Sequence, residues 1–221
     1  MMAVANENSP YEVAFSGFWA ALLRLLLKEY EQAEALAAAA FELSEKHQFQ
    51  VMAGNSGFIL GAARAHLGRT TEGIALIRQA KARLLEAHAK ISSCTVFLAI
   101  AQERAGNITD ALATVEQALQ ANPGEQMNRT GALMLRGELR LKQGQTELAE
   151  TDFRKAIEVA RTMNAKTPEL EITMSLAQLL DKQGRRDEAR TILADIYGWF
   201  TEGFDTADLK DAKALLDELG H

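Results

Sequence analysis

The feature that most constrains this chain is an internal repeat of about forty residues. Five segments share a small residue, a glycine or its substitute seven positions later, and a second small residue five positions further on. The anchors of the five segments are Lys28, Gly68, Gly106, Gly144 and Gly184. A period of this length is the signature of a solenoid, in which each unit buries its apolar face against its neighbours.

Each repeat is predicted to be a helical hairpin. The chain is rich in Ala, Leu, Glu and Lys and has only three prolines, a composition typical of packed helices. The small residues allow two antiparallel helices to approach closely, and the anchor between them ends the first helix. When the repeats are aligned, these small residues occupy two columns of equivalent positions. The column in the first helix is Ala21, Gly61, Ala99, Gly137 and Ala177, and the column in the second helix is Ala33, Gly73, Ala111, Ala149 and Ala189. Thr70, Thr109 and Thr146 follow anchors and are predicted N-caps.

We therefore expect an all-α protein, a right-handed α–α superhelix of five helical hairpins plus a C-terminal capping helix, with eleven helices in all. A disordered leader is expected at 1–10 and a single solenoid at 11–221. The expected repeats are about 11–48, 49–88, 89–124, 126–165 and 167–199, with the cap at 204–220.

The cap is predicted because the last repeat of a solenoid needs a terminal element with a polar outer face. The segment "DTADLKDAKALLDEL" carries one apolar stripe opposite Asp and Lys, with Asp205 or Thr206 as the N-cap. The stripe is formed by Leu209, Ala212, Leu215, Leu216 and Leu219. Four aromatic residues are predicted to pack between the fifth hairpin and the cap, namely Tyr197, Trp199, Phe200 and Phe204.

This pattern resembles the tetratricopeptide repeat, best in "GELRLKQGQTELAETDFRKAIEVA". There, small and aromatic residues occupy the positions that are typical of the family, namely Gly137, Gly144, Ala149, Phe153 and Ala156. The spacing is longer than the usual one of about 34 residues by roughly one helical turn per hairpin. The resemblance implies a binding array, and lengthened helices of this kind are common in bacterial regulatory proteins.

The C-terminal stretch "YGWFTEGFDTADLKDAKALLDEL" carries a second resemblance. It is similar to the end of large bacterial proteins that join a class III adenylyl or guanylyl cyclase domain, a STAND-type ATPase domain and a tetratricopeptide array. By this resemblance the chain is the C-terminal array of such a signalling protein, or a free-standing relative. An alternative is that the chain is a fragment of an adenylyl or guanylyl cyclase. In that case it would be classed by the activity of the whole enzyme, although it lacks the catalytic residues.

Composition and motifs argue against several other classes. A net charge of −6 gives no basic stripe for nucleic acid. The most apolar segment, Val13 to Leu27, is shorter than a membrane span and contains Arg24. No secretory signal precedes it, and Cys94 is the only cysteine and has apolar neighbours, so we expect a cytoplasmic protein.

The sequence indicates no catalytic, cofactor or metal site. It has no phosphate-binding loop of the GxxxxGK[ST] type, and His47, His66 and His88 lack metal-ligand spacing. The expected role is therefore non-catalytic binding of a protein or peptide, including an upstream domain of the same polypeptide, along the first helices of the hairpins. The predicted groove residues are Asn55, Phe58, Ala62, His66, Ser93, Val96, Ile100, Glu103, Met134, Glu138, Lys142, Glu171, Met174, Gln178 and Asp181.

The first helix has no preceding repeat to cover its apolar residues. These are Phe15, Phe18, Trp19, Leu22, Leu25 and Leu26. An exposed apolar patch of this kind marks an interface, so this face is predicted to stack on an upstream helix or to drive self-association. An oligomerisation module is accordingly a third interpretation of the chain.

Overall fold

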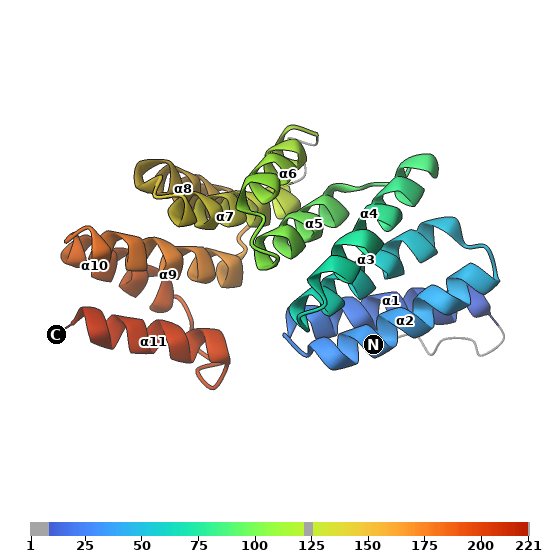
Figure 1. The fold of residues 1–221 in the computed structure, drawn as a ribbon. Helices are drawn as coiled ribbons and strands as arrows, with labels where there is room; N and C mark the ends of the chain where they lie inside the picture. Colours follow the sequence, from blue (N-terminus) through green and yellow to red (C-terminus); the bar gives the residue numbers. More distant parts are fainter. Residues whose placement is uncertain (1–8, 122–125, 221) are drawn as a thin grey trace. The chain divides into compact units, whose positions relative to one another are not determined.

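The computed structural model describes residues 9–121 and 126–220, which form eleven helices and no strand (Figure 1). The helices are α1 (Pro10–Leu26), α2 (Tyr30–Lys46), α3 (Gln50–His66), α4 (Thr70–Glu86), α5 (Ser92–Arg104), α6 (Ile108–Ala121), α7 (Gln126–Lys142), α8 (Thr146–Thr162), α9 (Lys166–Lys182), α10 (Arg186–Tyr197) and α11 (Ala207–Leu219). The predicted all-α class and the number of helices are confirmed. Most of the predicted leader, residues 1–8, and residues 122–124 of the third repeat lie outside the described residues.

Helix α1 begins inside the predicted leader, because Ser9 and Pro10 already belong to its first turn. Ser9 is the N-cap of this helix, and its hydroxyl oxygen accepts a hydrogen bond from the backbone N–H of Glu12 at 3.4 Å. Pro10 is the first helical residue, where its fixed φ angle suits the helix and its missing N–H has no helical partner.

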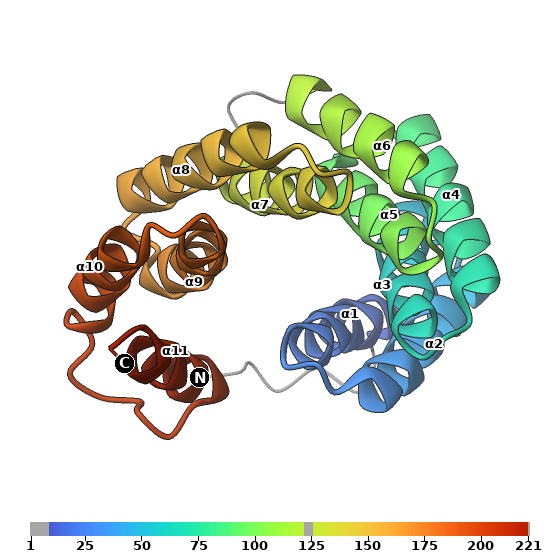
Figure 2. The ribbon, with the colours of Figure 1, turned by 60° about the vertical axis from the view of Figure 1, so that its left-hand side comes forward.

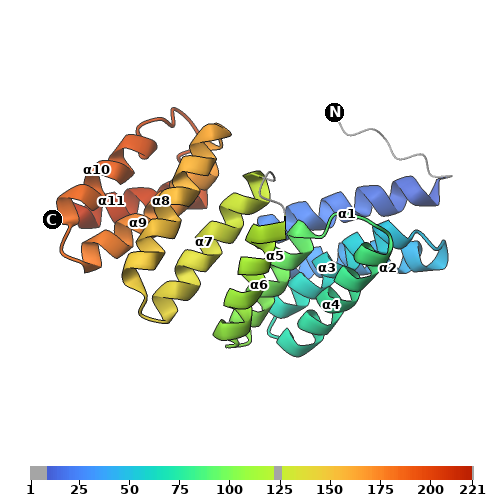
Figure 3. The same cartoon turned by 90° about the horizontal axis from the view of Figure 1, so that it is seen from above.

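The chain divides into two compact units, Met1–Ala118 and Leu119–His221. In the first unit α1 pairs with α2 and α3 with α4, the second hairpin packs on the first, and α5 packs on α3 and α4 (Figure 2). In the second unit α7 and α8 lie side by side, α9 pairs with α10, and α11 packs on both α9 and α10 (Figure 3). Each unit has its own hydrophobic core.

The turns inside the five hairpins share one backbone geometry, which makes hydroxyl caps unnecessary at the start of their second helices. Gly68 takes a φ of 87° at the end of α3, and Lys28 takes a φ of 62° at the corresponding place, so lysine does replace glycine there at some steric cost. The next residue, Arg69, donates its N–H to the carbonyl of Arg64 and accepts the N–H of Gly73, both at 2.9 Å. One residue therefore closes α3 and opens α4.

The predicted N-caps after the anchors are therefore wrong. Thr70 and Thr146 are the first residues of α4 and α8, and Thr109 lies one residue inside α6. The N-cap positions of α4 and α8 are held by Arg69 and Gln145, neither of which makes a side-chain capping bond. The backbone of the shared turn residue replaces the expected hydroxyl.

The capping helix is confirmed, but the aromatic residues before it are only partly packed. The predicted stripe of α11 faces the core of the second unit, and Leu209, Ala212, Leu215 and Leu219 are buried. Tyr197 and Phe200 also pack against this core. Trp199 and Phe204, however, are 55% and 47% exposed, so their predicted burial is wrong.

Candidate functional site

The predicted groove residues lie on α3, α5, α7 and α9, and the structure places them in different environments. In the first unit Phe58 and Ala62 are buried in the core, which leaves no surface for a ligand to contact. Partly exposed members are Asn55, His66, Ser93, Val96, Ile100, Glu103, Met134, Glu138, Met174 and Asp181. Lys142, Glu171 and Gln178 are exposed. The groove as a whole stays a prediction.

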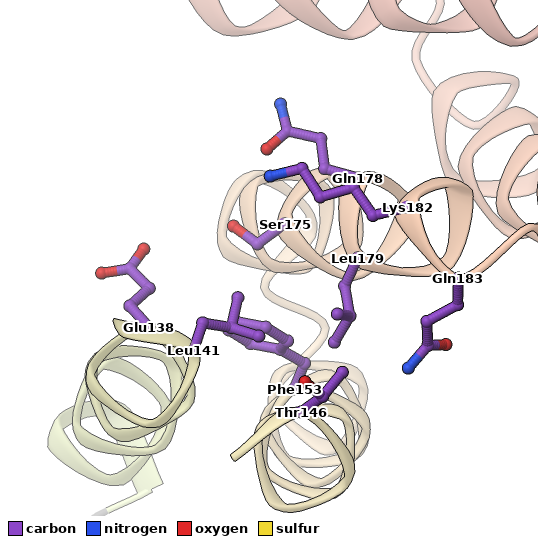
Figure 4. Close-up of a pocket in the computed structure, with 9 residues that line it drawn as sticks. All are labelled: Glu138, Leu141, Thr146, Phe153, Ser175, Gln178, Leu179, Lys182 and Gln183. Carbon is purple, nitrogen blue, oxygen red and sulfur yellow. The ribbon is translucent and has the colours of Figure 1, made fainter. Parts of the chain in front are cut away.

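A hollow with a volume of about 530 Å³ lies in the second unit, between α7, α8 and α9 (Figure 4). We refer to it as the α7–α9 hollow. It is lined by Glu138, Leu141, Thr146, Phe153, Ser175, Gln178, Leu179, Lys182 and Gln183. Only Glu138 and Gln178 of these belong to the predicted groove.

The floor of the hollow is apolar and is built by the repeat itself. Phe153 is fully buried and lies beneath Leu141 and Leu179 (Figure 4). Gly137 on α7 makes room for this ring, because a Cβ atom at Gly137 would come within 2.6 Å of it. The small residue and the aromatic residue of the repeat signature thus create the floor together.

The rim of the hollow is polar and carries both charges. Glu138 lies on α7, while Ser175, Gln178 and Lys182 lie on α9 (Figure 4). The Ser175 hydroxyl donates to the carbonyl of Glu171 at 3.4 Å. The side chain of Lys182 is exposed and reaches solvent at the rim.

On α9, most residues that line the hollow lie one position along the chain from the residues predicted for the groove. The groove prediction used Glu171, Met174, Gln178 and Asp181, whereas the hollow uses Ser175, Gln178, Leu179 and Lys182. One residue along a helix turns the face by about 100°. Ser175, Gln178 and Lys182 are three and then four residues apart, but the predicted set has the same helical spacing, so spacing alone does not choose between the two faces.

Buried charge fixes α7 on α8 next to the hollow. The guanidinium Nε and Nη2 atoms of Arg136 both donate to the Asp152 carboxylate, at 2.9 and 2.6 Å, and Arg140 donates to it at 2.7 Å. The Asp152 side chain is only 2% exposed. A bidentate pair of this kind sets the relative position of two helices more firmly than a single surface ion pair.

A second ion-pair cluster joins α8 to the start of α10. Glu150 and Glu188 each bind both Arg154 and Arg185, at 2.7–2.8 Å. Burial raises the pKa of Glu150, but hydrogen bonds from Arg154 and Arg185 outweigh it and hold the pKa below its ordinary value. These contacts hold the two hairpins of the second unit in register.

Two titratable side chains of the first unit, His66 and Cys94, are held in their neutral forms by burial. Burial, helped by the nearby Arg104 charge, lowers the pKa of His66 to about 4, and its ring stacks on Tyr30 with centroids 4.2 Å apart. Burial raises the pKa of the Cys94 thiol to about 12, which leaves it protonated and unreactive. No cluster of three or more His, Cys, Asp or Glu that could hold a metal ion occurs in the part of the chain that the structure describes.

A family model for the tetratricopeptide repeat matches residues 98–162 and 134–198, so this part of the chain contains tetratricopeptide repeats. No curated protein matches the sequence. Among the helices of residues 9–121 and 126–220, none is long and apolar enough to cross a membrane.

Solved structures share the fold over nearly the whole chain. The apo quorum sensor NprR from B. thuringiensis has a TM-score of 0.73 at 17% identity, and the match covers 95% of this chain and 60% of NprR. NprR has also been solved in complex with its cognate peptide NprX, with a TM-score of 0.72 at 16% identity over 97% of this chain and 68% of that one.

Two further structures have the same architecture. A thermophilic TPR protein from Thermus thermophilus has a TM-score of 0.70 at 19% identity, covering 92% of this chain and 98% of that one. A signal-transduction ATPase (STAND) protein with a tetratricopeptide repeat sensor, from Pyrococcus horikoshii, has a TM-score of 0.74 at 16% identity, covering 97% of this chain and 33% of that one. These likenesses show the fold alone and confirm a TPR-like solenoid.

Proposed function

We propose that this chain is a non-catalytic module that binds a protein or peptide, with the α7–α9 hollow as its contact site. The observation that carries the proposal is an open hollow with an apolar floor and a polar rim. Ligand sites typically combine an apolar surface with a few polar groups that fix orientation. The NprR structure with its cognate peptide, which shares the fold, supports the ligand class.

The lining suggests which peptide fits. An apolar side chain would insert between Leu141 and Leu179, while the amides of Gln178 and Gln183 would hydrogen-bond to the peptide backbone. Lys182 on α9 would attract a carboxylate of the ligand, and Glu138 on α7 would attract a basic group. A short peptide with one apolar residue and charges of both signs matches this arrangement.

Selection from a library of displayed short peptides against the full chain tests the proposal, with affinities measured by calorimetry. Replacing Gln178 and Lys182 by Ala should weaken a selected peptide at least tenfold, since a hydrogen bond to a charged group contributes about 1.5–3 kcal/mol and a neutral one about 0.5–1.5 kcal/mol. Ser175→Phe should fill the hollow and abolish binding without unfolding the chain. Replacing Gln32 and Lys46, exposed residues of the same types on α2, should change nothing.

The experiment also has a clear negative outcome. If selected peptides bind the Ser175→Phe variant as tightly as the original chain, the hollow is not the contact site. If no peptide is selected at all, the module does not bind short peptides, and the proposal fails in this form.

The cyclase–ATPase parent is a narrower proposal that rests on the C-terminal resemblance. The shared fold of a STAND protein with a repeat sensor supports the architecture of such a parent. In that setting an upstream domain of the same polypeptide would be the partner. Reading the flanking gene sequence tests it, since an in-frame cyclase or ATPase domain upstream is expected.

We propose no enzymatic activity for the chain itself. Purified protein should not turn over ATP or GTP with magnesium or manganese. Turnover that copurifies with the chain and disappears on changing one of its own residues would contradict this proposal.

A further inference from the structure

An apolar stripe lies open along α1 in the first unit. Phe15, Trp19, Leu23 and Leu26 follow the spacing of one helix face and are between 44% and 65% exposed. The rings of Phe15 and Trp19 are in contact, with centroids 6.1 Å apart, and Trp19 also meets Phe18 at 5.0 Å. We call these four residues the α1 stripe.

Comparison with the next repeat indicates the packing role of this face, because α3 is the equivalent first helix of the next hairpin. The residues of α3 that correspond to Trp19 and Leu23 are Ile59 and Ala63, and both are fully buried. On the side of the preceding hairpin, α3 packs on α1 and α2. The α1 stripe therefore occupies a stacking surface, and no described residue covers it.

The side chains of the α1 stripe differ from those of an internal stacking surface. Where α3 has Ile59 and Ala63, α1 has the larger Trp19 and Leu23. Small residues in α3 allow close approach to the preceding hairpin, as at Gly57, where a Cβ would come within 3.3 Å of the Phe41 ring. Bulky aromatic residues suit instead a wider helix–helix interface of the kind found between subunits.

In the second unit, the described outer face of α11 carries no exposed apolar stripe that could receive a second copy. The outer side of α11 is charged, with exposed Lys210, Asp211, Lys213, Asp217 and Glu218. Covering it with the α1 stripe would remove these charges from water against an apolar surface, which is costly. Head-to-tail growth is therefore disfavoured, and pairing of two α1 stripes closes the assembly at two copies.

We infer that the α1 stripe is the interface of a twofold dimer of this chain, in which two antiparallel α1 helices cross near Trp19. The stripe and its neighbours Tyr11 and Leu27 expose roughly 600 Å² of mainly apolar surface, judged from the areas of large side chains. A stable interface needs about 800 Å² per partner. The exposed face of α1 alone provides most of that area.

Light scattering of the full chain over a wide concentration series tests the dimer. The mass should rise to twice 24.2 kDa. The double variant Trp19→Glu and Leu23→Glu should weaken dimerisation by roughly a hundredfold or more, because central aromatic residues dominate interfaces. Trp199→Glu, which changes a tryptophan of similar exposure at the other end, should leave the dimer intact.

Two further measurements address the geometry. In the Trp199→Phe background Trp19 is the only tryptophan, and its emission should shift to the blue as dimers form. In the Trp19→Cys variant a short thiol crosslinker should join the two copies, since a twofold axis brings position 19 next to itself; the native Cys94 is buried and should not react.

Three results would overturn the inference. A chain that stays monomeric with water-exposed Trp19 would mean that the stripe serves another partner, such as an upstream hairpin of a longer polypeptide. A monomer with a blue emission that does not change with concentration would mean that the chain covers its own stripe. A dimer that resists crosslinking at position 19 would place the interface elsewhere.

Discussion

The α3–α4 hairpin of the first unit and the α7–α8 hairpin of the second solve the same packing problem in different ways. In α3–α4 both crossing positions are glycine, and a Cβ atom at Gly73 would lie 2.5 Å from the carbonyl oxygen of Gly61. In α7–α8 only Gly137 remains, and the space is filled by the Phe153 ring. The approach of the two helices is limited by backbone contact in α3–α4 and by a side chain in α7–α8.

The two hairpins also differ in how charge joins their helices to a neighbour. Glu45 of α2 pairs with Arg83 of α4 near the surface, where the two side chains are 43% and 20% exposed. Asp152, in contrast, is buried between α8 and α7 against Arg136 and Arg140. The comparison teaches that one repeat pattern can be stabilised by backbone contact or by side-chain and ionic contact, and these should respond differently to mutation.

The largest expected effect is at the buried carboxylate. Asp152→Asn should lower the free energy of unfolding of the second unit by about 3–5 kcal/mol, because two arginines lose the charge that compensates them. Glu45→Gln should cost less than about 1 kcal/mol, as for exposed pairs. Hydrogen exchange of α7–α8 and α3–α4 peptides measures both, and equal effects would remove the contrast.

The next effect is at the glycine crossing. Gly73→Ala should destabilise α3–α4 by about 2–3 kcal/mol, since overpacking forces the two backbones apart. Adding Ile77→Val to Gly73→Ala should not restore the lost stability, because the obstacle is the Gly61 carbonyl and not a side chain. Denaturant unfolding of the single and double variants checks this, and recovery in the double variant would be contrary evidence.

Gly137→Ala should behave differently although it occupies the same column. Alone it should cost about 1–2 kcal/mol, because the new methyl group meets the Phe153 ring. In the Phe153→Leu background the same change should be neutral or stabilising by up to about 1 kcal/mol, since alanine favours the helix more than glycine. A double-mutant cycle measures the coupling, and simple additivity would contradict it.

The smallest effect concerns acid. The pKa of His66 is lowered from 6.5 to about 4, so the unfolded chain binds its proton first and the contribution of neutral His66 is lost as the pH falls from about 6.5 towards 4. The His66→Phe variant should show a weaker decrease in unfolding midpoint over this range. His47→Phe, at an exposed site, should behave like the original chain.

The second unit should respond to acid later. Glu150 and Glu188 have pKa values held below 4.5 by Arg154 and Arg185, so their contribution is present above that pH and is lost as the pH falls further. Exchange in α8 and α10 should therefore accelerate at lower pH than exchange in α3. The reverse order would show that His66 does not govern the acid response of the first unit.

The sequence was sufficient to predict the helices because their signal is periodic and local. Buried small residues at Ala21, Gly61, Ala149 and Ala189 follow the predicted columns. The N-caps were not predictable from residue type, because the backbone of a turn residue such as Arg69 performs the capping. The shared turn has no hydroxyl signature to recognise.

The candidate site and the aromatic turn were harder to predict for a different reason. A change of one residue rotates a helix face by about 100°, and nothing in the sequence around Gln178 fixes which face meets α7. Likewise, an aromatic residue next to a glycine indicates a turn but not the direction of its ring. The ring of Trp199 points outward beneath the ammonium group of Lys166, which lies 5.6 Å from its centroid.

The turn residue that closes one helix and opens the next also bears on how such a chain can evolve. Arg69, Gln145 and Arg185 each make the same pair of backbone bonds, whatever their side chains. Recombination between the gene segments that encode any two of these turns would join a helix end to a helix start that already fit. Whole hairpins can therefore be gained or lost in one genetic step, without selection for a new linker.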